Sequence, residues 1–104
     1  MARELEILRK KVPGVGERLA EEVVGFVQEL RKQDLFKLPG VAETLDWAHA
    51  LAQLDVIQLN PDVVNSTLGT LLKYQDDIAR IQGSEAIAIL NEIRTQAAVS
   101  SAGG

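Results

Sequence analysis

Cysteine is absent from this chain of 104 residues, and histidine occurs only once, as His49. The absence of cysteine excludes disulfides and thiolate chemistry, and it fits a reducing compartment. One histidine cannot assemble a zinc site, and the carboxylates follow no calcium-loop spacing, so we expect no metal site. A Ser-His-Asp triad could use only His49, which we expect to be a structural histidine packed on a core-facing helix.

The sequence also lacks a phosphate-binding loop of the form Gly-x-x-x-x-Gly-Lys-Ser/Thr, since none of its eight glycines opens one. Asp76 and Asp77 are adjacent carboxylates. Neighbours on a helix point about 100° apart, so this pair is not a natural acid–base dyad, and we expect it on solvated helix surface. The sequence therefore predicts no catalytic residue, and we expect the chain alone not to be an enzyme.

Aromatic residues are scarce, at 4%, and no apolar run approaches the roughly 20 residues of a transmembrane helix. Charged residues follow Met1 almost at once, in Arg3 and Glu4, which is not the pattern of a secretory signal. The net charge of −4 disfavours nonspecific binding to DNA or to acidic membranes. We therefore expect a cytoplasmic protein with no membrane partner, and DNA is a disfavoured partner.

Apolar residues make up 46% of the chain and recur at helical spacing, with no strand pattern. The clearest stripe consists of Leu19, Val23, Phe26, Val27 and Leu30. Proline and glycine breaks divide the chain into helices expected near 4–11, 16–32, 41–54, from 61 and from 84. We predict the all-α class: a compact bundle of five to six short helices in one domain, residues 1–99, with a disordered tail at 100–104.

The helix expected at 41–54 holds the only tryptophan, Trp47. It is apolar over so wide an arc that we expect it to be covered on more than one side. Its predicted core stripe is Val41, Leu45, Ala48 and Ala52, with Trp47, Leu51 and Leu54 beside it. The connection that follows is predicted to place Val56, Ile57 and Leu59 in the core.

Residues 8–24, which read Leu-Arg-Lys-Lys-Val-Pro-Gly-Val-Gly-Glu-Arg-Leu-Ala-Glu-Glu-Val-Val, resemble a helix-hairpin-helix DNA-binding motif. In such a motif the hairpin amides and the next helix's N-terminus hold a DNA phosphate. The resemblance implies DNA contacts by Lys11, Gly14, Gly16 and Arg18. Against it, acidic side chains crowd the helix start that should meet the phosphate: Glu17, Glu21 and Glu22.

A second resemblance covers roughly residues 8–80. Its segments are Val12-Pro-Gly, Val23–Leu30, Asp34-Leu-Phe-Lys, Pro39-Gly-Val-Ala-Glu-Thr-Leu-Asp-Trp-Ala48 and Thr67-Leu-Gly-Thr-Leu-Leu-Lys-Tyr-Gln-Asp-Asp-Ile78. In order and spacing they resemble the C-terminal helical lid of MoxR-type AAA+ ATPases. The last two segments are far more specific than a glycine hairpin, so the lid is our main interpretation and the DNA module the alternative. A helical adaptor that recognises a protein partner is a third class.

The resemblance implies that the chain covers the nucleotide of an ATPase core and couples ATP binding and hydrolysis to the remodelling or maturation of protein complexes. The core would lie in the same polypeptide and would supply the sites for ATP and Mg²⁺, so no cofactor is expected in this chain alone. The other implied partners are neighbouring subunits of a ring and a von Willebrand A-domain protein.

The residues that this resemblance places near nucleotide are Lys37, Pro39, Gly40, Val41, Ala42 and Thr44. Many AAA+ lids carry an arginine near the start of this helix that reaches the γ-phosphate. Here Thr44 stands at that position, with Glu43 beside it. Thr44 cannot supply positive charge, whereas Lys37 in the preceding turn could substitute for the arginine.

Overall fold

The computed structural model describes residues 2–103, and the side chains of residues 3–97. Within this range the chain forms six helices and no strand, which confirms the all-α prediction. The helices are α1 (Ala2–Lys11), α2 (Glu17–Leu30), α3 (Val41–Gln53), α4 (Pro61–Leu71), α5 (Gln75–Ile81) and α6 (Ser84–Gly103). Among the described residues, no helix is both long enough and apolar enough to cross a membrane.

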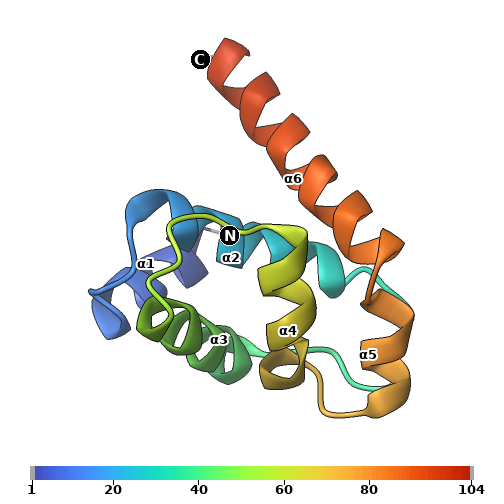
Figure 1. The fold of residues 1–104 in the computed structure, drawn as a ribbon. Helices are drawn as coiled ribbons and strands as arrows, with labels where there is room; N and C mark the ends of the chain where they lie inside the picture. Colours follow the sequence, from blue (N-terminus) through green and yellow to red (C-terminus); the bar gives the residue numbers. More distant parts are fainter. Residues whose placement is uncertain (1, 104) are drawn as a thin grey trace.

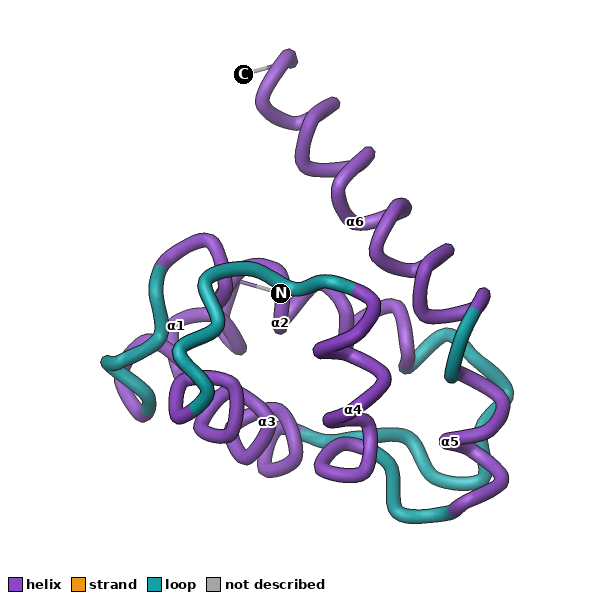
Figure 2. Tube along the Cα trace, in the orientation of Figure 1, coloured by secondary structure: helices purple, strands orange, loops and turns teal. Residues whose placement is uncertain are grey.

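Helices α2 and α3 organise the bundle (Figures 1 and 2). Helix α3 packs against α1, α2 and α4, while α2 also packs against α6. Helix α6 also packs against α4 and α5, and its far end extends beyond the body of the bundle (Figure 1). The expectation that α3 is covered on more than one side is therefore confirmed.

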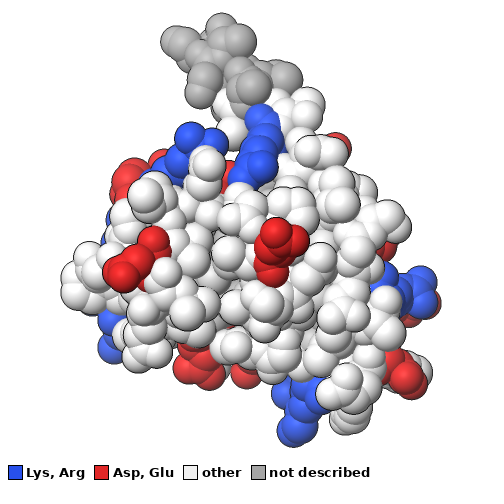
Figure 3. All heavy atoms as spheres, viewed as in Figure 1, with Lys and Arg blue, Asp and Glu red and all other residues white. Residues whose placement is uncertain are grey.

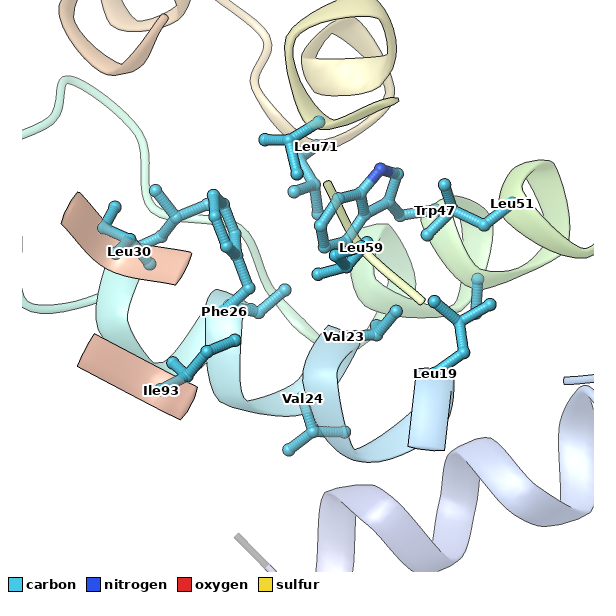
Figure 4. Close-up of a cluster of buried hydrophobic side chains, with 14 of the residues drawn as sticks. Leu19, Val23, Val24, Phe26, Leu30, Trp47, Leu51, Leu59, Leu71 and Ile93 are labelled. Carbon is cyan, nitrogen blue, oxygen red and sulfur yellow. The ribbon is translucent and has the colours of Figure 1, made fainter. Parts of the chain in front are cut away.

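The centre of the core is an aromatic pair, one ring from α2 and one from α3 (Figure 4). The ring centroids of Phe26 and Trp47 lie 5.4 Å apart at a tilt of 53°, and both side chains are fully buried. Trp47 Nε1 donates a hydrogen bond to Thr67 Oγ1 of α4 at 2.8 Å, which satisfies the one polar atom of the indole. Buried leucines surround the pair: Leu19, Leu51, Leu59 and Leu71.

The buried face of α3 differs from the predicted one. Its buried residues are Thr44, Trp47, Ala48 and Leu51. Val41 and Leu54 are exposed, and Leu45 and Ala52 are only partly buried. His49 is exposed rather than packed in the core, because on an α-helix it points away from this stripe.

The connection after α3 is only partly as predicted. Leu59 is fully buried and Val56 partly buried, but Ile57 is 80% exposed. Asp55 takes a positive φ of 57° here, so the chain turns sharply directly before these residues. The predicted helix start at Pro61 is confirmed, because Asn60 Oδ1 accepts the Val63 amide at 2.9 Å as an N-cap.

Gly25 faces Ile93 where α2 crosses α6. A Cβ placed on Gly25 would lie 3.5 Å from Ile93 Cγ2, which is ordinary van der Waals contact. The close approach of the two helices therefore does not require glycine, and Gly25 is a tolerated residue in mid-helix.

Helix α6 is helical along its backbone as far as Gly103, across most of the segment predicted as a disordered tail. No proline or glycine precedes Gly103 in this stretch, so the helical pattern has no break at residue 99. Gly104 and the side chains from residue 98 onward lie outside the described part of the chain.

Candidate functional site at the start of helix α3

The loop between α2 and α3 is fixed at its middle by a buried carboxylate of α5. Asp77 Oδ1 accepts the Phe36 amide at 2.9 Å, and Asp77 Oδ2 accepts the Lys37 amide at 3.2 Å. Asp77 is 2% exposed, whereas Asp76 is exposed. The prediction that both carboxylates lie on solvated surface is therefore wrong for Asp77. Since successive helical residues diverge by about 100°, one member of the pair turns inward while the other stays in water.

The two ends of the same loop are held by a second buried carboxylate, that of Glu4. Arg31 directly follows α2, and its Nη1 and Nη2 each lie 2.8 Å from a Glu4 carboxylate oxygen. Arg31 Nε donates to the Pro39 carbonyl at 2.9 Å. Gln28 and Thr44 also donate to the Glu4 carboxylate, each at 3.0 Å. The hydrogen bonds from Arg31, which outweigh the opposing effect of burial, lower the pKa of Glu4 below its ordinary value.

The Thr44 side chain makes its hydrogen bonds within this network. Its side chain is fully buried, and its Oγ1 lies 3.0 Å from both Glu4 Oε2 and the Gly40 carbonyl. The hydroxyl has one proton, so it donates to one of these acceptors at a time. Beside it, the Glu43 carboxylate accepts the Gly40 amide at 2.7 Å, closing the first turn of α3.

The residues that the resemblance associates with nucleotide therefore divide into two groups. Pro39 and Thr44 are buried, so neither presents a side chain to a ligand. The remaining four are exposed at the start of α3: Lys37, Gly40, Val41 and Ala42.

A cleft of about 260 Å³ lies beside this helix start. One wall comes from the loop and α3, with Lys37, Leu38, Glu43 and Asp46, and the other from the end of α4, Gly69–Leu71, with Leu72 and Lys73 after it. Two lysines and two carboxylates face it, so its charge is mixed. It is smaller than the roughly 300–1,000 Å³ of typical small-molecule sites, and it lies between two segments that are far apart in the sequence.

The hairpin between α1 and α2, which carries the DNA-binding alternative, leaves Lys11, Gly14, Gly16 and Arg18 exposed. The Arg9 guanidinium, however, pairs with both carboxylate oxygens of Glu17, the first residue of α2. A negative charge thus occupies the helix end where a phosphate would bind. On the face shown in Figure 3, basic and acidic side chains are interspersed and form no basic patch.

Glu22, predicted to crowd the same helix start, lies elsewhere. It is buried at the α2–α6 contact, where Oε1 accepts the Leu59 amide at 2.8 Å and Oε2 accepts Arg94 Nε at 3.1 Å. Arg94 also donates to the Leu59 carbonyl. This network is structural, since it fixes the chain entering α4 to both long helices.

Sequence reasoning did not identify the buried carboxylates Glu4, Glu22 and Asp77 as anchors. Glu22 does lie one turn from both Leu19 and Phe26 of the core stripe, which is a signal for burial. No local signal links Glu4 to Thr44 or Asp77 to Phe36. Among the described side chains, no buried polar atom lacks a hydrogen-bond partner, and no three potential metal ligands are clustered.

Comparison of the chain with models of known protein families, with curated proteins and with solved structures finds no match.

Proposed function

We propose that this chain is the C-terminal helical lid of a MoxR-type AAA+ ATPase, where it covers the nucleotide and couples ATP binding and hydrolysis to the remodelling of a protein complex. One observation carries the proposal: the separate sequence segments that resemble this lid contact one another. Trp47 donates to Thr67, and Asp77 accepts the amides of Phe36 and Lys37.

These contacts support the proposal because they connect the parts of the chain that carry the resemblance. Here the partners are 20 and about 40 residues apart, and each pair joins two different matching segments. The last two segments also form the two walls of the cleft beside α3. The segments that carry the resemblance therefore belong to one packed unit, which is what the lid proposal requires.

In the proposed role, nucleotide meets the exposed start of α3. Lys37 supplies the positive charge, and the backbone at Gly40, Val41 and Ala42 approaches the adenine or ribose. Thr44 takes no part, because its hydroxyl is buried against Glu4. In this role the cleft contacts only one edge of the nucleotide and is not the complete binding site. The carboxylates of Glu43 and Asp46 line it and would repel a polyphosphate. The ATPase core would therefore hold the phosphates and Mg²⁺.

The partners in this proposal are the ATPase core of the same polypeptide, the neighbouring subunits of a ring, and a von Willebrand A-domain protein. The chain's own contribution would be mechanical. In this role the lid moves as one body, held together by its core and its three buried carboxylates, and passes displacement at the nucleotide to the next subunit.

The test begins with the gene. We expect the reading frame ahead of Met1 to encode a phosphate-binding loop and Mg²⁺-binding acids; a stop codon in frame immediately upstream would overturn the proposal. In the complete ATPase, Lys37→Ala should raise KM for ATP several-fold. Lys10→Ala is the matched control, because Lys10 is also exposed but lies on α1 and does not line the cleft. Equal effects of the two variants would refute the role of Lys37.

A further inference from the structure

Two loops bring an aromatic pair together on the surface of the bundle. Phe36, in the loop after α2, is 78% exposed, and Tyr74, between α4 and α5, is 48% exposed. Their ring centroids lie 6.2 Å apart at an interplanar angle of 69°, an edge-to-face contact. The two loops are drawn in teal beside the lower part of α5 in Figure 2. Half of the chain's four aromatic residues are therefore at the surface rather than in the core.

The position of Phe36 is set by its backbone. Asp77 accepts the amides of Phe36 and Lys37, and Asp77 is itself buried at the start of α5. The backbone beneath the exposed Phe36 ring is thus fixed. An aromatic residue whose backbone is already ordered loses less conformational entropy when a partner binds, which suits a binding anchor.

The surroundings of the pair are acidic. On one side of Phe36 is a hollow lined by Asp34, Leu35, Asp76, Asp77 and Arg80. Phe36 also lines a second hollow, together with Tyr74, Gln75 and Asp76. Three carboxylates and one guanidinium line these two hollows, so the charge within them is negative. The exposed Lys37 and Lys73 are the chain neighbours of the two rings but do not line the hollows. The structure shows no ion pair to Asp34, Asp76 or Arg80 among the side chains of residues 3–97.

We propose that this surface, made of Phe36, Tyr74, Asp34 and Asp76, binds an arginine side chain of a partner protein. A guanidinium stacks on aromatic faces and pairs with a carboxylate through its planar fork, so both features of the surface are used by one side chain. A wholly apolar partner would bury the two carboxylates unpaired, and a nucleic acid would bring phosphates against them.

This inference does not rest on the proposed lid function, because it follows from the surface alone. If the chain is a lid, the arginine belongs to the ATPase core or to a neighbouring subunit. The competing possibility is that a second copy of this chain occupies the surface. The experiment distinguishes a partner's arginine from a second copy.

The experiment is an NMR titration of the ¹⁵N-labelled chain with the tripeptide acetyl-Gly-Arg-Gly-amide. We expect saturable shifts confined to Phe36, Tyr74, Asp76 and their neighbours at peptide concentrations up to about 50 mM. The analogue with citrulline in place of arginine has the same shape without the charge, and it should bind at least about threefold more weakly. Phe36→Ala and Asp76→Asn should each weaken binding of the arginine peptide by a similar factor.

Ile57→Ala is the matched control, since Ile57 is as exposed as Phe36 but lies in the connection between α3 and α4. It should leave the titration unchanged. Phe36, Asp76 and Ile57 are all exposed, so these substitutions should leave the fold intact. A change in binding then reports on the surface itself. The proposal is overturned by the absence of saturable shifts, by equal binding of the citrulline peptide, or by full binding to Phe36→Ala. It is also overturned if sedimentation shows a dimer that Phe36→Ala abolishes, because the occupant is then a second copy.

Discussion

Arg31 binds both carboxylate oxygens of Glu4 and, through Nε, the carbonyl of Pro39. One side chain therefore joins α1, the end of α2 and the loop that leads into α3. Glu4 is 7% exposed, and Arg31 retains about a quarter of its surface in water, so the pair is largely desolvated. Breaking a desolvated pair leaves a charge without its partner, which costs more than the pair contributes when intact.

Glu4→Ala should accordingly lower the free energy of unfolding by about 3 kcal/mol, measured by urea denaturation. The substitution also removes an acceptor from Thr44 and Gln28. Glu6→Ala, at an exposed position two residues along α1, is the control and should stay within about 0.5 kcal/mol of the parent chain. Equal, small effects of the two substitutions would show that the network does not hold α1 in place.

The same carboxylate makes stability depend on pH. The pKa of Glu4 is lowered in the folded protein relative to its ordinary value of 4.5, chiefly by the Arg31 hydrogen bonds. A lowered folded pKa contributes stability that is present in full above pH 4.5 and is lost as the pH falls through the folded value. The difference in unfolding free energy between the parent chain and Glu4→Gln should therefore shrink from pH 7 to about pH 3. A pH-independent difference would contradict this linkage.

Trp47→Ala should destabilise the chain by about 4 kcal/mol, because it empties the centre of the core and removes the donor to Thr67. Leu54→Ala, directly after the same helix, is the control, since Leu54 is 60% exposed and its truncation leaves no cavity. Thermal or urea denaturation measures both. A loss below about 1 kcal/mol for Trp47→Ala would mean that the neighbouring side chains collapse into the space, contrary to dense packing.

The sequence was sufficient to predict the positions of five of the six helices and most of their limits, but not the break that separates α5 from α4. Pro13-Gly14, Pro39-Gly40 and Asn60-Pro61 mark breaks by restricting φ, removing amide donors and providing a cap, and these effects act within a few residues. The amphipathic stripe of α2 likewise points to its buried face without knowledge of the partner, and Leu19 and Leu30 at its two ends are buried as expected.

The rotation of α3 could not be predicted in this way. Its sequence is apolar around most of its circumference, so periodicity alone does not select one face. The buried face includes a polar residue, Thr44, whose hydroxyl lies within hydrogen-bond distance of the carboxylate of Glu4, 40 residues away. The same reason applies to Asp77, whose partners Phe36 and Lys37 are as distant. Long-range polar pairs of this kind position the candidate site, and no local pattern encodes them.

The α1–α2 hairpin should not bind DNA. Its helix start carries the Glu17 carboxylate, which pairs with Arg9, and the whole chain has a net charge of −4. In a low-salt titration with a duplex of about 20 base pairs, we expect no saturable binding in the micromolar range. Glu17→Ala makes the test more demanding, because it frees Arg9 and removes the opposing charge, and it too should fail to bind.

Micromolar binding that weakens steeply with salt and is abolished by Gly14→Glu would instead establish the hairpin as a DNA-binding module. Gly14→Ala is the matched control for that variant, since a Cβ there meets no atom within 4 Å and adds no charge.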